Sequence, residues 1–224
     1  MVAVLVVVTM LALIALDYFV LRKWREAEGA EDVPVPGLGP MSEVMRRLPA
    51  GVFVQPTYTW ARICEDGDVL VGVHPMLLGL VGVPFELDLL PSGERIAAGE
   101  PLTRVGHAGH RLTIRSPVAG EITEVNRRIV GDAGWESPAA ENGSWLYRIH
   151  PAEVTALVDG SMIGERALAW TREQYDKLRA FLLRSTPSRE IGVALPDGGE
   201  IPVGILSGMD DDVWQAVQRE FLGS

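Results

Sequence analysis

Lysine and cysteine are scarce in this 224-residue chain. It holds only two lysines, Lys23 and Lys177. The single cysteine, Cys64, excludes an intrachain disulfide and suits a reducing compartment. We expect it to be a small buried residue, since no sequence-adjacent histidine or basic cluster activates its thiol. The formal net charge of −10 argues against nucleic-acid binding, which requires a positive surface. It also argues against broad adhesion of the chain to an anionic membrane.

Catalytic signatures are missing as well. The sequence shows no nucleophile–base pattern, no phosphate-binding loop and no glycine-rich dinucleotide fingerprint. The acidic run 210–212 resembles a metal site, but at the start of a helix it more simply complements the helix dipole. We therefore expect neither an enzyme nor a resident cofactor or metal.

Apolar residues are concentrated at the N-terminus. Val2–Leu16 is apolar except for Thr9, and Tyr18–Leu21 continues the run beyond Asp17. About 20 helical residues span the roughly 30 Å hydrocarbon core of a bilayer. Residues 1–25 are therefore predicted to form a single transmembrane anchor. Asp17 is expected to pair with Arg22 or Lys23 at the headgroups, or else to contact a neighbouring membrane helix.

A cleaved signal peptide is the alternative, but such peptides carry basic residues before the apolar core. Here Arg22, Lys23 and Arg25 follow it, which favours a retained anchor. The positive-inside bias then puts the N-terminus outside and the bulk of the chain in the cytoplasm, on an inner membrane. The residues expected at the cytoplasmic interface of the anchor are Asp17, Tyr18, Phe19, Arg22, Lys23, Trp24 and Arg25.

A Pro/Gly-rich linker is predicted over residues 26–50, with a short helix at about Ser42–Leu48 before Pro49. A mainly β domain follows over residues 51–151. Its predicted strands are Trp60–Ile63, Val69–Val73, Val83–Leu89, Leu102–Val105, Arg111–Ile114, Glu121–Val125 and Trp145–Ile149.

A small α+β module is predicted over residues 152–224. Thr171 and Gln174 form a capping-box pattern that predicts a helix start. Strands are expected at Ile191–Leu195 and Ile201–Leu206, joined by a hairpin turn at 196–199. A last helix is predicted from about Asp210 to Leu222, burying one apolar face made of Val213, Trp214, Val217 and Phe221.

Several segments of residues 51–151 together resemble one family. In chain order they are Tyr58–Arg62, Val69–Val73, His74–Gly79, Val83–Leu87, Pro91–Pro101, Ser116–Asn126 and Trp145–Ile149. The collinear set resembles the H protein of the glycine cleavage system, so the domain is expected to be a flattened lipoyl-type barrel of two small sheets. That family carries lipoic acid on a lysine at a hairpin tip. Counting back from Ser116-Pro117, the lysine's position falls on Gly109.

The resemblance therefore implies a fold without its carrier chemistry, because glycine has no amine to acylate. Two histidines on the hairpin are too few for a metal site, which needs three or four ligands. The hairpin's donors are instead expected to contact an acidic partner surface; they are His107, His110, Arg111 and Arg115.

These expectations converge on an accessory subunit. The anchor would pack against other integral membrane subunits, and the domain would cap the cytoplasmic face of a larger complex. The layout is similar to that of single-span subunits of photosynthetic and respiratory complexes, which is an analogy of architecture only. The alternatives are a membrane-anchored enzyme or ligand sensor that uses the His107–Arg111 hairpin, and a transient assembly factor.

Overall fold

The computed structural model describes residues 41–45, 48–82, 86–129, 145–185 and 200–223. All of them belong to one compact unit, Leu38–Ser224. The predicted anchor and its interfacial residues, most of the linker, and the predicted strand and turn at 191–199 lie outside the described residues. Within the described ranges, no helix combines the length and the apolar character needed to cross a membrane.

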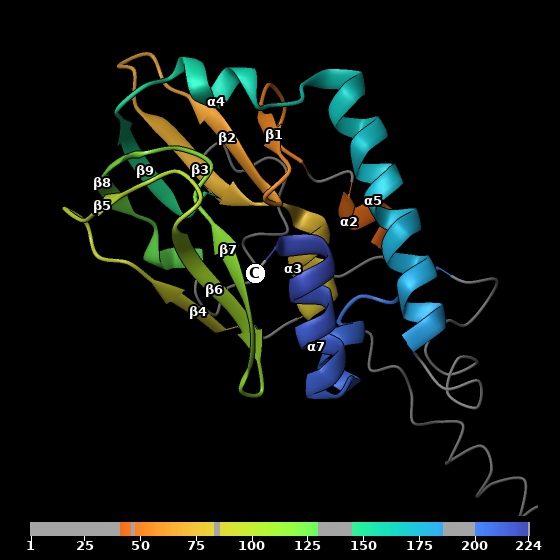
Figure 1. The fold of residues 1–224 in the computed structure, drawn as a ribbon. Helices are drawn as coiled ribbons and strands as arrows, with labels where there is room; N and C mark the ends of the chain where they lie inside the picture. The colour runs from red at the N-terminus through yellow and green to blue at the C-terminus, as the bar shows by residue number, and fades with distance from the viewer. Residues whose placement is uncertain (1–40, 46–47, 83–85, 130–144, 186–199, 224) are drawn as a thin grey trace, which may run out of the picture. The chain divides into compact units, whose positions relative to one another are not determined.

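The larger of two antiparallel sheets runs in the order β1-β2-β3-β9-β8-β5 (Figure 1). Its strands are β1 (Phe53–Gln55), β2 (Thr59–Ile63), β3 (Val69–Val73), β5 (Arg95–Ile96), β8 (Gly120–Val125) and β9 (Tyr147–Pro151). The smaller sheet has the order β4-β6-β7, made of β4 (Glu86–Leu89), β6 (Pro101–His107) and β7 (His110–Arg115). The predicted mainly β domain of two sheets is confirmed, although β1 and β5 were not predicted.

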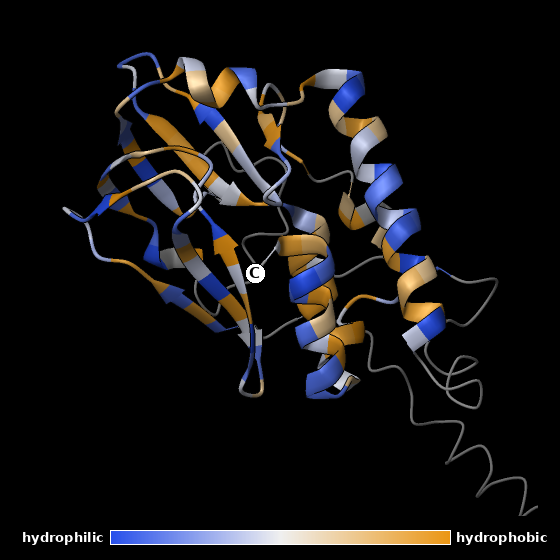
Figure 2. Ribbon diagram, viewed as in Figure 1, coloured by the Kyte–Doolittle hydropathy of each residue, from blue (hydrophilic) through white to orange (hydrophobic). Residues whose placement is uncertain are grey.

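Burial alternates with a period of two along β4 and β7, whereas β3 is buried at all five positions. Along β7, Leu112 and Ile114 are buried while Thr113 between them is partly exposed. In Figure 2 the strands of the smaller sheet carry both hydrophobic and hydrophilic colours along their length. Tyr147 of β9 ties the two sheets together: its hydroxyl donates to the Leu102 carbonyl at 3.1 Å and accepts from the Leu90 N–H at 2.9 Å.

Helix α3 (Pro75–Val81) is buried at every position. It begins after His74, whose Nδ1 accepts a hydrogen bond from the Met76 N–H at 3.2 Å, and Pro75 occupies the first turn. Helix α2 (Met41–Met45) packs on it, with Met41 against Gly79. The short helix predicted near residues 42–48 is present, but it starts and ends earlier.

Helices α4 (Thr155–Asp159) and α5 (Gly164–Ser185) follow the last strand. The predicted helix start at Thr171 is wrong, because α5 begins seven residues earlier. Thr171 is a buried interior residue whose hydroxyl donates to the Ala167 carbonyl at 2.8 Å, and the same oxygen lies 3.1 Å from His74 Nε2. Gln174 accepts a hydrogen bond from the Tyr58 hydroxyl at 3.1 Å instead of capping the helix.

The final segment comprises the 3-10 turn η3 (Ile205–Gly208), helix α7 (Asp211–Val217) and the π-helical turn η4 (Gln218–Leu222). The final helix is confirmed, with Asp211 and Asp212 in its first turn. Of its predicted apolar face, Trp214 and Val217 are buried, whereas Val213 and Phe221 are only partly buried. The strand predicted at Ile201–Leu206 is wrong. Ile201 and Leu206 are buried without pairing to a strand, so their apolar character reflects packing against the core rather than strand formation.

Backbone contact with α3 fixes this segment's path. The Gly204 N–H donates to the Gly79 carbonyl at 2.7 Å. A Cβ on Gly82 would lie 2.6 Å from the Gly204 Cα, so glycine at position 82 permits the crossing.

Candidate functional site

The β6–β7 hairpin was the first candidate site, and its tip is a two-residue turn. Ala108 (φ 50°) and Gly109 (φ 92°) join His107 to its register partner His110. Positive φ at both turn residues is typical of a type I′ turn, which glycine adopts readily and other residues adopt at a cost. Gly106 is also constrained, because a Cβ there would lie 2.2 Å from the His110 carbonyl oxygen. The hairpin therefore ends in small residues held by backbone geometry.

One flank of the hairpin is covered by α7 and η4. The His110 ring stacks on Trp214 with 5.5 Å between ring centroids and 17° between planes, and its Nδ1 lies 3.3 Å from an Asp211 carboxylate oxygen. Gln218 pairs with the backbone of Thr113: its Oε1 accepts from the N–H at 2.7 Å, and its Nε2 donates to the carbonyl at 3.3 Å. These two hydrogen bonds satisfy the backbone N–H and carbonyl of Thr113 on the outer edge of β7, where a further strand would otherwise pair.

Most of the basic residues of the hairpin form ion pairs or hydrogen bonds with other residues of the same chain. Arg111 forms ion pairs with Glu86 at 3.0 Å and Asp88 at 2.7 Å, both on β4. Arg115 donates to the Gly99 carbonyl at 2.9 Å. His107 is partly exposed at the end of β6. The structure thus brings the four predicted residues onto one hairpin, but it engages at least three of them internally.

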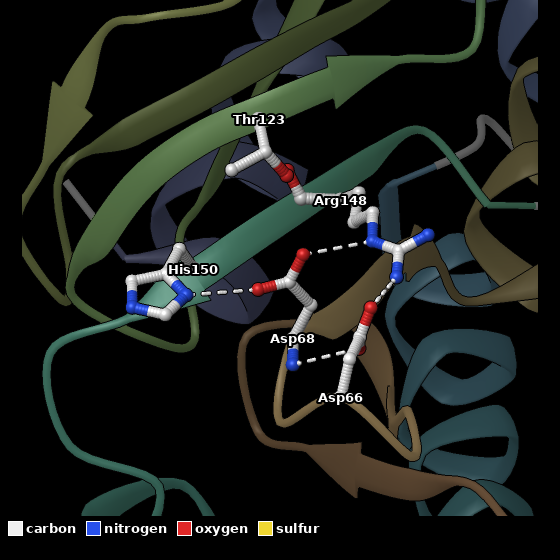
Figure 3. A network of polar contacts seen from close by, with 5 residues as sticks. All are labelled: Asp66, Asp68, Thr123, Arg148 and His150. Atoms are coloured by element: carbon white, nitrogen blue, oxygen red, sulfur yellow. Dashed lines mark hydrogen bonds and ion pairs between the residues drawn. The ribbon is translucent and has the colours of Figure 1, made fainter.

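A second polar site joins the β2–β3 turn to β9 (Figure 3). The Asp68 carboxylate accepts from His150 Nδ1 at 2.9 Å and from Arg148 Nε at 2.8 Å. These two hydrogen bonds hold the pKa of the Asp68 carboxyl below its usual value, with the His150 bond the larger cause. Arg148 also pairs with Asp66, and the Thr123 hydroxyl donates to the Arg148 carbonyl at 3.1 Å.

An oriented Asp–His pair is one part of a hydrolytic triad, which also requires a nucleophile beside the histidine. His150 borders a shallow groove of about 640 Å³. Its lining residues are Arg95, Ile96, Ala97, Ala119, Gly120, Glu121, His150, Pro151 and Ala152. None of these carries a hydroxyl or thiol. The pair therefore acts as a clasp that fixes the β2–β3 turn on β9.

A third polar cluster is buried where the larger sheet meets α5. His74 is fully buried, and its ring lies 5.9 Å from that of Trp170 in an edge-on arrangement. Burial lowers the pKa of His74 to about 4. Tyr58, with its ring 5.1 Å from Trp170, is held at φ 56°, and burial raises the pKa of its hydroxyl. These contacts dock α5 on the sheet, and they bury His74, Tyr58 and Thr171.

Among the described residues, no group of three or more His, Cys, Asp or Glu side chains is arranged so that it could hold a metal ion. The Asp68–His150 clasp and the packing of Trp214 on His110 were missed from the sequence. Asp68 and His150 are 82 positions apart in the sequence, and His110 and Trp214 are 104 positions apart. In the sequence, only the helical spacing of the apolar residues around Trp214 predicted a buried face. This spacing did not indicate which surface that face would cover.

Comparison with known proteins is consistent with this geometry. The family model "Glycine cleavage H-protein" matches residues 53–173. The glycine cleavage system H protein of Methylococcus capsulatus is 31% identical over 110 residues, covering 49% of this chain and 86% of that protein. The H protein 2 of Pseudomonas syringae is 30% identical over 112 residues, covering 50% and 87%.

Among solved structures, a glycine cleavage system H protein from Mycobacterium marinum superposes with a TM-score of 0.46 at 22% identity. The superposed region covers 55% of this chain and 98% of the Mycobacterium marinum chain. The family match ends inside α5, so the rest of that helix, η3, α7 and η4 lie beyond it. Through residues 53–173, the chain belongs to the glycine cleavage H-protein family.

Proposed function

We propose that this protein is a membrane-anchored, non-lipoylated member of the H-protein family that acts as an accessory scaffold subunit of a larger membrane complex. The hairpin tip is the observation that carries the proposal. The family's carrier chemistry requires a lysine amine at this tip, and the tip here consists of Ala108 and Gly109. Neither side chain can form an amide with lipoic acid.

The other lysines do not substitute for the missing one. Of the two lysines, Lys177 lies within the described residues, on α5, and its Nζ is 2.7 Å from a Glu173 carboxylate oxygen. A surface ion pair on the side of a helix lacks the projecting turn of the hairpin. Lys23 is the second residue after the N-terminal apolar run, which ends at Leu21. An acylating enzyme that reads the hairpin turn therefore has no target amine in this chain.

The covered flank of the hairpin supports a scaffold over a carrier. A carrier must present its arm to several enzymes in turn, whereas here His110 and Thr113 are held by Trp214 and Gln218. All of the C-terminal residues that make these contacts lie beyond the family match. The addition stabilises the hairpin in one position, which suits a rigid body that binds partners.

The membrane part of the proposal is supported by sequence. The apolar run that ends at Leu21 is long enough to span a bilayer, and Arg22, Lys23 and Arg25 follow it as a cytoplasmic flank. The partners we propose are other integral membrane subunits, with the compact unit on the cytoplasmic side. No small-molecule cofactor is part of this function.

Intact-mass spectrometry tests the non-lipoylated state. The full chain is expressed with a lipoate ligase and excess lipoate, beside a lipoyl carrier domain as the positive control. We expect the mass of the unmodified chain, while the carrier gains one lipoyl group. The Gly109→Lys variant shows whether the turn can still be recognised once an amine is restored. A lipoyl group on Lys23 or Lys177 of the unaltered chain would contradict the proposal.

A further inference from the structure

One face of helix α5 is exposed over the first turns of the helix. Glu165, Leu168, Ala169 and Arg172 are all exposed, and their spacing of three, four and seven residues places them on one side of the helix. Leu168 is 48% exposed, whereas Ala167 on the opposite side is buried. In Figure 1, α5 lies along one flank of the unit, away from β5 and β8. The face is therefore open to another molecule.

Two residues of this face carry charges of opposite sign, and they are placed symmetrically. Glu165 stands three residues before Leu168, and Arg172 stands three residues after Ala169. The two charges are thus about 10 Å apart along the helix axis, with one large and one small apolar side chain between them. Within the described residues, neither Glu165 nor Arg172 forms an ion pair. Both charges lack a counter-ion on the described part of the chain.

The charges on this part of α5 cancel. Residues 164–177 carry three acidic and three basic side chains, all of them exposed, namely Glu165, Arg166, Arg172, Glu173, Asp176 and Lys177. Of these, Glu173 and Lys177 pair with each other at 2.7 Å. A surface without net charge has no general attraction for an anionic membrane or for a strongly acidic or basic partner. It selects a partner whose charges stand in the complementary order.

We infer that this face pairs with the same face of a second copy of the chain. In an antiparallel arrangement with a twofold axis between Leu168 and Ala169, Glu165 of each copy stands opposite Arg172 of the other. Both ion pairs form together, because a twofold interface repeats every contact. Leu168 then covers Ala169 of the second copy, and a large side chain over a small one lets the two helix axes approach to about 8–10 Å. The second copy supplies the counter-ion that each charge lacks.

The surface beside this face is apolar, which suits such a contact. Leu168 also lines a groove of about 410 Å³ between α5 and the segment that leads into β1, and the groove lining contains no charged side chain. Ile163, which is 56% exposed, lines the same groove. Two short helix segments bury less than the roughly 1,200–2,000 Å² of a stable interface, so we expect a weak, reversible dimer. The face belongs to the compact unit, so the inference goes beyond the proposed function and does not depend on the anchor.

Cysteine cross-linking of the full chain in mild detergent tests the pairing. Cys64→Ser removes the only native thiol, and Ala169→Cys then places one thiol beside the twofold axis. A short bismaleimide is added, and covalent dimers are quantified on denaturing gels. Leu183→Cys is the matched control, because this position is also exposed on α5. In the inferred arrangement its two copies lie about 44 Å apart along the helices, so we expect dimers at 169 and few or none at 183.

Charge reversal tests which residues meet. Glu165→Arg and Arg172→Glu, each combined with Ala169→Cys, bring like charges together in a dimer of identical chains, and each should lower the dimer yield at least threefold. When the two variants carry different tags and are mixed, opposite charges face each other at both positions, and the cross-link between them should recover. Asp176→Arg, an acid reversal one turn beyond Arg172, should leave the yield unchanged.

Equal yields at 169 and 183 would overturn the inference, and so would a cross-link at 169 that neither reversal weakens. A yield that falls with Asp176→Arg but not with Glu165→Arg would overturn the inferred register. If the same cysteine in native membranes captured another protein in place of a second copy, the face would belong to that protein and the inference would be wrong. The proposed function is tested separately, by the lipoylation state and by co-elution with membrane subunits, so either proposal can fail alone.

Discussion

Protonation of His74 is predicted to destabilise the compact unit in mild acid. The ring is fully buried, accepts from the Met76 N–H and lies 3.1 Å from the Thr171 hydroxyl, so its surroundings suit the neutral form. Its pKa is about 4 in the folded protein and about 6.5 in an unfolded chain. Between these values the unfolded state binds more protons than the folded state. Stability is therefore complete above the unfolded pKa, falls as the pH drops toward 4, and changes no further below it.

The size of the effect follows from the pKa difference. At about 1.4 kcal/mol per pKa unit, the full loss is about 3 kcal/mol, and about 2 kcal/mol of it is expected between about pH 8 and about pH 5. Asp68 also contributes to the pH dependence of stability, but its pKa is low. The loss of stability that comes from protonating its carboxylate therefore occurs in more acidic solution.

The assay is urea unfolding of residues 38–224 across this pH range, followed by tryptophan fluorescence, for the unaltered sequence and His74→Asn. Asparagine retains a helix-capping oxygen but does not titrate. The variant is expected to be less stable at neutral pH, because the Thr171 contact is lost, and to show a flatter pH dependence. If the free energies of unfolding of the two proteins fell in parallel, His74 would not be the titrating group and the reasoning would be refuted.

Three further perturbations test other parts of the structure. Gln218→Ala removes both hydrogen bonds to Thr113 and is expected to lower the free energy of unfolding in urea by about 1–2 kcal/mol. The control Gln215→Ala, on the exposed surface of α7, should change it by no more than about 0.5 kcal/mol. Equal losses in the two variants would contradict the role of η4 in covering β7. Gly82→Ala puts a Cβ 2.6 Å from the Gly204 Cα, whereas Gly67→Ala, also at positive φ, meets nothing within 4 Å. The first should cost about 1–3 kcal/mol more than the second, and a difference near zero would show that the crossing relaxes freely. Asp68→Asn weakens the hydrogen bonds with His150 and Arg148. Since the pKa of the Asp68 carboxyl is lowered in the folded protein, the ionised carboxylate stabilises the fold above the ordinary carboxyl pKa. This stabilisation is lost as the pH falls through the pKa of the folded state. The stability gap to the unaltered protein should therefore close in acid, and a gap that persisted there would indicate that packing, not charge, is lost.

The strands were predictable where a single segment carries its own alternating pattern. Val69–Val73 is predicted and found with the same bounds, and the turn before it is marked by Gly67 and Asp68. The hairpin at 107–110 was placed through the resemblance rather than through periodicity. β1 escaped prediction because it has only three residues, and its pairing with β2 is not visible in its own sequence.

The errors have a common physical cause. Thr171 and Gln174 form a capping-box pattern, but burial against His74 and Tyr58 uses both side chains for tertiary hydrogen bonds inside a helix that starts at Gly164. Ile201–Leu206 has strand-like composition, yet its apolar residues pack on the core from an irregular segment. In each case a long-range contact outweighed a local preference, and such contacts cannot be read from one stretch of sequence.

We propose that the chain serves as a stoichiometric, non-lipoylated subunit of a membrane complex. To test this, the full-length protein is isolated from its native membranes in mild detergent, and the co-eluting proteins are identified and quantified. We expect a set of integral membrane proteins in fixed ratio to this chain, with no lipoyl group on it. Elution of the chain alone from well-preserved membranes, or with the soluble enzymes of glycine cleavage, would contradict it.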